Sequence, residues 1–122
     1  MLYNKAKQKI ISTEEIMATG FLSQARGLMF RRKQNLIIIL PQEQKVSLHM
    51  FFVFYPIDVL ILDEQKKIVE IKRNFRPFTF WTSPQKGKYV VELALPRAYD
   101  STYNSAYNIG DTLEFRGILQ KH

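Results

Sequence analysis

The chain contains no cysteine among its 122 residues, which excludes disulfide bonds, thiolate metal sites and cysteine nucleophiles. Glycine and proline are scarce, at five residues each, and no segment repeats another or is of low complexity. Acidic residues are outnumbered, because 11 Asp and Glu face 18 Lys and Arg, so the formal net charge is +7. With 46% hydrophobic and 24% charged residues, the composition is that of a folded globular protein.

No apolar run is long enough to cross a bilayer. The longest, Phe51 to Leu62, is interrupted by Pro56 and Asp58. The N-terminal stretch MLYNKAKQKII lacks the apolar core of a signal peptide. We therefore expect no membrane span and a cytoplasmic location. The length predicts a single domain over residues 1–122, while the oligomeric state is left open.

Familiar catalytic and cofactor motifs are also missing from the sequence. It has no Gly-x-Ser-x-Gly nucleophile elbow, no phosphate-binding P-loop and no dinucleotide fingerprint. His49 is the only internal histidine, and no His-x-x-His or carboxylate cluster accompanies it. We therefore expect no metal and no cofactor, and we favour a protein that is not an enzyme.

Most of the chain has the composition of β-strands. Apolar or alternating runs predict strands at Leu36–Leu40, Val46–Tyr55, Ile57–Leu62, Ile68–Lys72, Tyr89–Leu95 and Thr112–Leu119. A polar turn is predicted at Gln42–Lys45, and a loop with a short extended piece at Arg73–Pro84. Many short strands with one short helix predict a mainly β fold, either a small β-sandwich or a distorted β-barrel.

The N-terminal third admits two interpretations. Ser12-x-x-Glu15 resembles a capping box, which would begin one long helix over residues 13–25. Alternatively, Lys9 to Ala18 is a strand, followed by a shorter helix near residues 19–26. Gly20 disfavours the long helix, because glycine lowers helix stability, so we favour the shorter one.

One charged residue interrupts the most apolar part of the chain. In VSLHMFFVFYPIDVLIL, from Val46 to Leu62, only Asp58 normally carries a full charge at neutral pH. A buried carboxylate requires a partner, because burying an unpaired charge is costly. Asp58 could hold a cationic or hydroxyl-bearing ligand, or act as an acid or base. Alternatively, it could accept hydrogen bonds from backbone N–H groups after Pro56, or pair internally with an arginine.

Several segments in a fixed order carry a family resemblance. These are RGLMFR at residues 26–31, HMFFVF at 49–54, PIDVL at 56–60, Val91-Glu92-Leu93 and Gly110-Asp111. In this order the chain resembles a bacterial and archaeal family known as domain of unknown function 192. The resemblance implies a mainly β sandwich or distorted barrel with a short helix before RGLMFR, and it implies no established reaction.

The leading functional hypothesis is a non-catalytic β binding module with a pocket or rim near Asp58 and RGLMFR. Arg26 and Arg31, at the two ends of RGLMFR, are the predicted partners of Asp58 and could face a small ligand. The competing interpretation of RGLMFR is a helix stop at Gly27 followed by core residues. Glu92 is a second acid within an apolar strand, and if it shared a cavity with Asp58, an enzyme with paired carboxylates would be a third hypothesis.

The alternative function is association with nucleic acid. Arg73, Arg76, Phe78 and Trp81 combine cations with aromatic rings on which bases can stack. The net positive charge would favour such a partner, although the basic residues are scattered along the sequence. The competing interpretation is that these aromatic residues form a lid over the core.

Overall fold

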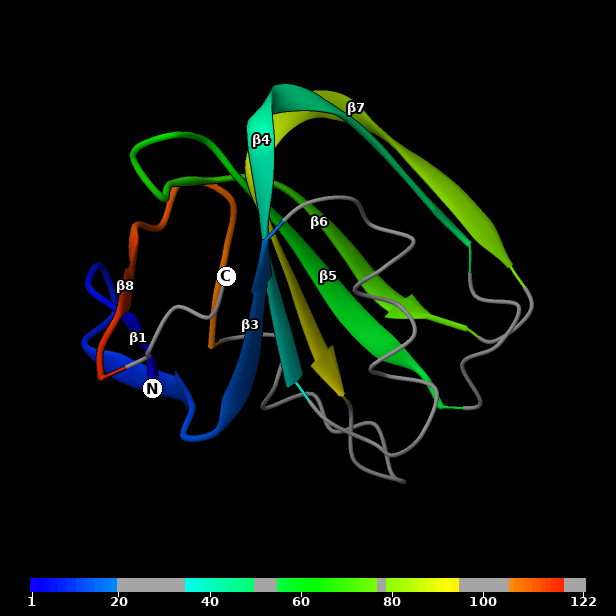
Figure 1. Ribbon diagram of the computed structural model, residues 1–122. Helices are drawn as coiled ribbons and strands as arrows, with labels where there is room; N and C mark the ends of the chain where they lie inside the picture. Colours follow the sequence, from blue (N-terminus) through cyan, green and yellow to red (C-terminus); the bar gives the residue numbers. More distant parts are fainter. Residues whose placement is uncertain (20–34, 50–54, 77–78, 95–105, 118–122) are drawn as a thin grey trace.

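The computed structural model describes residues 1–19, 35–49, 55–76, 79–94 and 106–117, and the regular elements in these ranges are all β-strands. They are β1 (Leu2–Asn4), β2 (Lys9–Ser12), β3 (Glu15–Thr19), β4 (Asn35–His49), β5 (Ile57–Leu62), β6 (Ile68–Phe75), β7 (Phe80–Ala94) and β8 (Leu113–Phe115). A three-stranded sheet has the order β2-β1-β8, and a five-stranded sheet has the order β3-β4-β7-β5-β6 (Figure 1). The predicted β-sandwich is confirmed, and the described strands form two sheets instead of one closed barrel.

The five-stranded sheet has an apolar cluster on each face. Val59 of β5 belongs to one cluster, to which β4 and β7 contribute where they arch over the sheet (Figure 1). Leu60, the next residue, belongs to the other cluster, together with Leu2 and Leu113 of the small sheet. Successive side chains of a strand point to opposite faces, so Asp58 lies on the face of Leu60. This is the face that the small sheet covers.

The predicted turn at Gln42–Lys45 is wrong, because β4 continues through this stretch. Ile39 lies opposite Tyr89 and Gln44 lies opposite Gly87, so residues 40–43 form a bulge in the strand. Lys88 compensates for the lost ladder bonds: its Nζ donates to the carbonyl oxygens of Leu40 at 2.7 Å and Pro41 at 3.2 Å. A proline is tolerated at a bulge because no ladder hydrogen bond is required of it there.

The predicted loop at Arg73–Pro84 is also partly wrong, because β7 begins at Phe80. Pro84 also lies at an irregularity. The three residues 83–85 of β7 oppose the single residue Val46 of β4. The Ser83 hydroxyl donates to the carbonyl of Gln85 at 2.8 Å and accepts from its N–H at 3.2 Å. The two long strands therefore stay paired as one bent ribbon, which carries the chain over the core.

The two predicted strands Ile57–Leu62 and Ile68–Lys72 are confirmed, and they form an antiparallel hairpin of β5 and β6. Its turn is built around Asp63, whose Oδ1 accepts the backbone N–H groups of Gln65 and Lys67, each at 2.9 Å. Lys66 has a φ of 63°, and its amine lies over the rings of Tyr89 and Phe115, at 5.6 Å and 5.2 Å. The hairpin is thus fixed to both sheets, since Phe115 belongs to β8.

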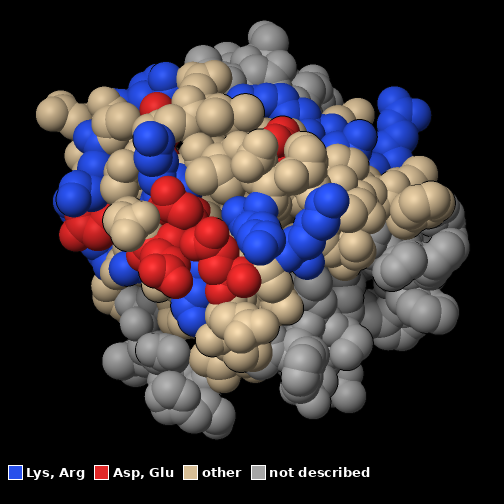
Figure 2. Space-filling view, turned by 90° about the horizontal axis from the view of Figure 1, so that it is seen from above, with Lys and Arg blue, Asp and Glu red and all other residues tan. Residues whose placement is uncertain are grey.

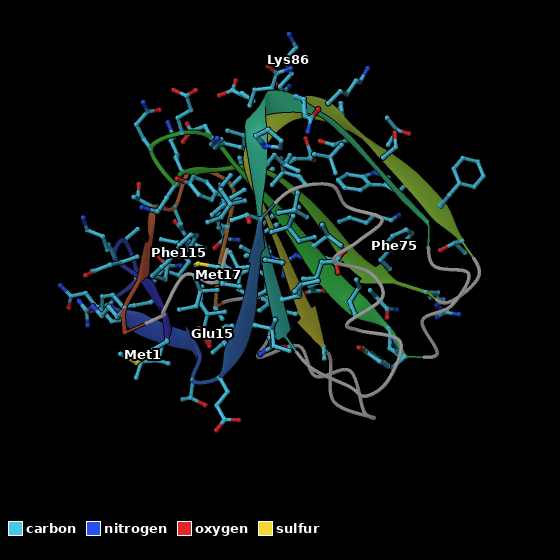
Figure 3. The ribbon with its side chains drawn as sticks, in the orientation of Figure 1. Met1, Glu15, Met17, Phe75, Lys86 and Phe115 are labelled. Carbon is cyan, nitrogen blue, oxygen red and sulfur yellow. The ribbon has the colours of Figure 1, made fainter. Side chains whose placement is uncertain are left out.

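In the N-terminal third, the long helix over residues 13–25 is wrong, because Glu15–Thr19 is strand β3. Ser12 and Glu15 do bond, with the Ser12 hydroxyl donating to Glu15 Oε2 at 2.9 Å, but they hold a strand connection. The Met1 amino group forms an ion pair with Glu15 at 3.0 Å and links the two sheets (Figure 3). The short helix predicted near residues 19–26 falls, beyond Thr19, outside the described residues. β3 and β4 are parallel, with Glu15 opposite Asn35 and Thr19 opposite Ile39.

Candidate functional site around Asp58 and Arg73

Asp58 faces an irregularity in the neighbouring strand β6. Ile57 lies opposite Phe75 and Val59 opposite Lys72, so two residues of β6, Arg73 and Asn74, oppose Asp58 alone. This arrangement is a β-bulge, which disturbs the ladder hydrogen bonds. The N–H of Asn74 donates to Asp58 Oδ1 at 2.8 Å. Asn74 has a φ of 48°, a left-handed conformation that asparagine tolerates better than most residues.

The second carboxylate oxygen of Asp58 has two further contacts. The hydroxyl of Tyr107 donates to Oδ2 inside the core. Nη1 of Arg73 lies 3.7 Å from the same oxygen. Both carboxylate oxygens therefore have partners, and the Asp58 side chain is 0% exposed. These contacts compensate for the burial of its charge.

Arg73 is held on three sides by this cluster. Its Nη2 donates to the backbone carbonyl of Tyr107 at 2.7 Å, and its Cζ lies 4.9 Å from the centre of the Tyr107 ring. Together with the Asp58 contact, these interactions fix both the position and the plane of the guanidinium. The Arg73 side chain nevertheless remains 28% exposed, so it reaches the surface where Asp58 does not.

Tyr107 is itself fixed by the N-terminal sheet. The buried side-chain amide of Asn4 donates to the carbonyl of Ala106 at 3.0 Å and to Asp111 Oδ2 at 2.9 Å. Asp111 Oδ2 also accepts the N–H of Asn108 at 2.9 Å. These bonds press the segment around Tyr107 against the face of the sheet that carries Asp58. The cluster thus depends on three parts of the chain that are far apart in sequence.

Asp58 and Glu92 do not share a site. Asp58 lies opposite Leu93 and Glu92 lies opposite Val59 in the β5–β7 pairing. Directly opposite residues share a face and neighbours alternate, so the two carboxylates point to opposite faces of the sheet. Both are buried. A mechanism that requires two carboxylates flanking one bond therefore has no basis in this geometry.

The structure does not bring the other predicted site residues that it describes together in one site. Arg26, Arg31 and Phe78 lie outside the described residues. Arg76 is exposed, whereas Trp81 is partly buried and packs against the core cluster that contains Val59. Arg73, which the sequence assigned to the nucleic-acid alternative, instead contacts Asp58. The Arg73–Trp81 stretch therefore does not present one continuous row of outward side chains.

Tyr107 is the residue that sequence reasoning missed. It is 49 residues from Asp58 and lies within Pro96–Asn108, a polar, tyrosine-rich stretch whose sequence fits either a loop or a short helix. No spacing or local pattern connects the two. The only indication was that a buried carboxylate needs hydrogen-bond donors, and a tyrosine hydroxyl is one candidate.

The described residues offer neither a metal-binding cluster nor a membrane-spanning helix. They contain no group of three or more His, Asp or Glu side chains positioned to hold a metal ion. They also contain no helix that is long and apolar enough to span a membrane.

Comparison with known proteins places the chain among its relatives. The family model DUF192, described as Uncharacterized ACR, matches residues 2–115. The chain belongs to this family. A UPF0127 protein of Thermococcus sibiricus is 38% identical over 96 residues, which cover 75% of this chain and 62% of that protein. The chain therefore spans less than two thirds of that relative. UPF0127 protein PF1050 of Pyrococcus furiosus is 31% identical over 121 residues, covering 97% of this chain and 100% of that one.

Two crystal structures share the fold of this DUF192 member. One, from Sinorhizobium meliloti 1021 and provisionally described as a transcription regulator, has a TM-score of 0.68 at 21% identity and covers 82% of this chain and 79% of that one. The other, a protein of unknown function from Novosphingobium aromaticivorans, also has a TM-score of 0.68, at 20% identity, covering 83% of this chain and 74% of that one. These likenesses establish the fold alone, and the family supplies no specific function.

Proposed function

We propose that this protein is a non-catalytic binding module that takes up a small anionic ligand through Arg73. The observation that carries the proposal is the state of this guanidinium, which is fixed by Asp58 and Tyr107 yet 28% exposed. A pre-positioned guanidinium loses little conformational entropy when it binds, and its planar fork matches a carboxylate or a phosphate. Arg26 and Arg31 remain proposed contributors to the same rim.

In this proposal Asp58 is a positioning residue. Its carboxylate is fully buried and contacts Asn74, Tyr107 and Arg73, so it acts on a ligand only through Arg73. Because Asp58 offsets much of the positive charge of Arg73, the geometry of the guanidinium would contribute more to affinity than its net charge. Glu92 takes no part, since it lies on the opposite face of the sheet.

The test is isothermal titration calorimetry with inorganic phosphate and with citrate as probes. We expect saturable binding to the unaltered chain and loss of that binding in Arg73→Gln. Arg73→Lys should also weaken binding several-fold, because lysine keeps the charge but lacks the planar fork. Arg76→Gln is the matched control, since Arg76 is an exposed arginine three residues away, and it should bind both probes normally.

The proposal fails if Arg73→Gln binds both probes as tightly as the unaltered chain, or if Arg76→Gln loses as much affinity. Unfolding of each variant is followed by circular dichroism, so that a loss of binding is read only from folded protein. We also propose that this binding takes place in the cytoplasm. Fractionation of cells that express the tagged chain tests that location.

A further inference from the structure

The bent ribbon of β4 and β7 has an outer face whose side chains are exposed. Side chains that point inward include Val46 and Ser83, which are buried, and Trp81, which packs on the core. The alternate residues point outward. Phe80 is 72% exposed. We call the set Phe80, Thr82, Ser47, Lys45 and Lys86 the ribbon face; all five side chains are exposed.

Lysines form one end of the ribbon face. Lys45 and Lys86 are directly opposite each other in the β4–β7 pairing, and both are exposed. In the described part of the chain, neither takes part in an ion pair. Like charges placed opposite each other in a sheet are mildly destabilising, so a bound anion would relieve their repulsion. Lys86 stands at the crest of the arch (Figure 3), and Figure 2, which looks down on the crest, shows Lys and Arg side chains there beside a separate acidic group.

An aromatic ring forms the other end of the ribbon face. Phe80 lies opposite His49 in the backbone pairing. The pair Ser47 and Thr82 lies between this pair and the lysine pair on the same face. The hydroxyls of Ser47 and Thr82 are 3.0 Å apart and add polar groups to that face. Lys45 and His49 are four positions apart on β4, which corresponds to about 13 Å along a strand.

We propose that the ribbon face is a contact surface for single-stranded nucleic acid. Phe80 would stack on a base, and Lys45 and Lys86 would contact phosphates further along the strand. Proteins that bind single strands without sequence preference combine these two elements, an exposed aromatic ring and a basic track. The formal net charge of +7 also favours association of the whole molecule with a polyanion. An acidic peptide would satisfy the lysines but would offer the exposed ring of Phe80 no base to stack on.

Fluorescence anisotropy with a labelled oligothymidylate of about 12 nucleotides tests the proposal, since sites for single strands span roughly 4–16 nucleotides. We expect binding at low salt that weakens as salt is raised. Phe80→Ala should lower the affinity by roughly tenfold, the loss of one stacked base. The double variant Lys45→Gln, Lys86→Gln should reduce the slope of log affinity against log salt by about 1.4, as expected for two lost phosphate contacts.

Matched controls come from the small sheet. Ile10→Ala removes another exposed apolar side chain, and Lys5→Gln with Lys9→Gln removes two exposed lysines. These controls should leave stacking intact and change the salt slope less than the ribbon double variant. No binding at low salt would overturn the proposal, as would equal losses in the ribbon and control variants. A competition experiment gives a further test. If poly-glutamate displaced the labelled oligonucleotide as effectively as unlabelled oligonucleotide does, the proposal would be overturned, because the surface would then recognise negative charge alone.

Discussion

At the scale of single residues, Asp58 shows how a buried charge is accommodated. The carboxylate replaces the ladder bond that the β6 bulge cannot make and accepts the Asn74 N–H. Its other oxygen contacts the Tyr107 hydroxyl and the Arg73 guanidinium, so two separate parts of the chain compensate the charge. A lone acid in an apolar strand can therefore act as the hydrogen-bond acceptor for a backbone N–H of the neighbouring strand, without any ligand.

Replacing Tyr107 with phenylalanine should destabilise the fold by about 1–3 kcal/mol, because the buried carboxylate loses a donor and nothing replaces it. Urea unfolding followed by circular dichroism measures the change. Tyr3→Phe is the matched control: the ring of Tyr3 lies 3.8 Å from the guanidinium carbon of Arg116, a contact that the substitution keeps. It should shift the free energy of unfolding by less than about 0.5 kcal/mol. Equal stability of Tyr107→Phe and the unaltered chain would contradict this account of Asp58.

Glu114 gives a prediction for pH. The hydrogen bond from Arg116 at 3.1 Å lowers the pKa of the Glu114 carboxyl from its ordinary value, and it outweighs the opposing effect of desolvation. A carboxyl with a lowered pKa stabilises the folded state above its unfolded pKa, and this contribution is lost as the pH falls through the folded pKa. An NMR titration of the carboxyl carbon should therefore give a midpoint below that of an ordinary glutamate. Arg116→Gln should return the pKa towards that value, and an unchanged midpoint would count against the assignment.

At the scale of elements, the long strands were the least predictable from the sequence. Pro41 and Pro84 indicated strand ends, yet both lie at irregularities within continuous strands. The local pattern contains the proline but not the partner strand, and Lys88, which binds the carbonyls beside Pro41, is 47 residues away. By contrast, the β5–β6 hairpin was predictable, since its turn residues and both strands are local.

Lys88→Met should destabilise the ribbon by about 1 kcal/mol, because the carbonyls of Leu40 and Pro41 lose their common charged donor. Thermal or urea unfolding measures the effect. Lys86→Met is the matched control on the same strand, since Lys86 is exposed and stabilises no backbone group in the described residues. If both variants lost the same amount of stability, the bulge would not depend on Lys88.

At the scale of the whole molecule, the fold class and the face occupied by Asp58 followed from strand composition and period-two alternation. The partners of Asp58 did not follow, because the Arg73 bulge and Tyr107 reach it only when two sheets pack together. The sequence placed Glu92 and Asp58 in similar apolar strands, but only the register between β5 and β7 shows that they face apart. Membership of the DUF192 family agrees with the two-sheet fold and leaves the ligand to experiment.

In the proposed function, Arg73, held by Asp58 and Tyr107, contacts an anionic ligand. NMR of the arginine side-chain N–H groups during a titration with inorganic phosphate tests it most directly. We expect the Arg73 signals to shift and saturate, while those of the exposed Arg76 shift only weakly and without saturation. Equal, non-saturating shifts of both arginines would contradict it, because the phosphate would then be responding to the general positive charge of the surface.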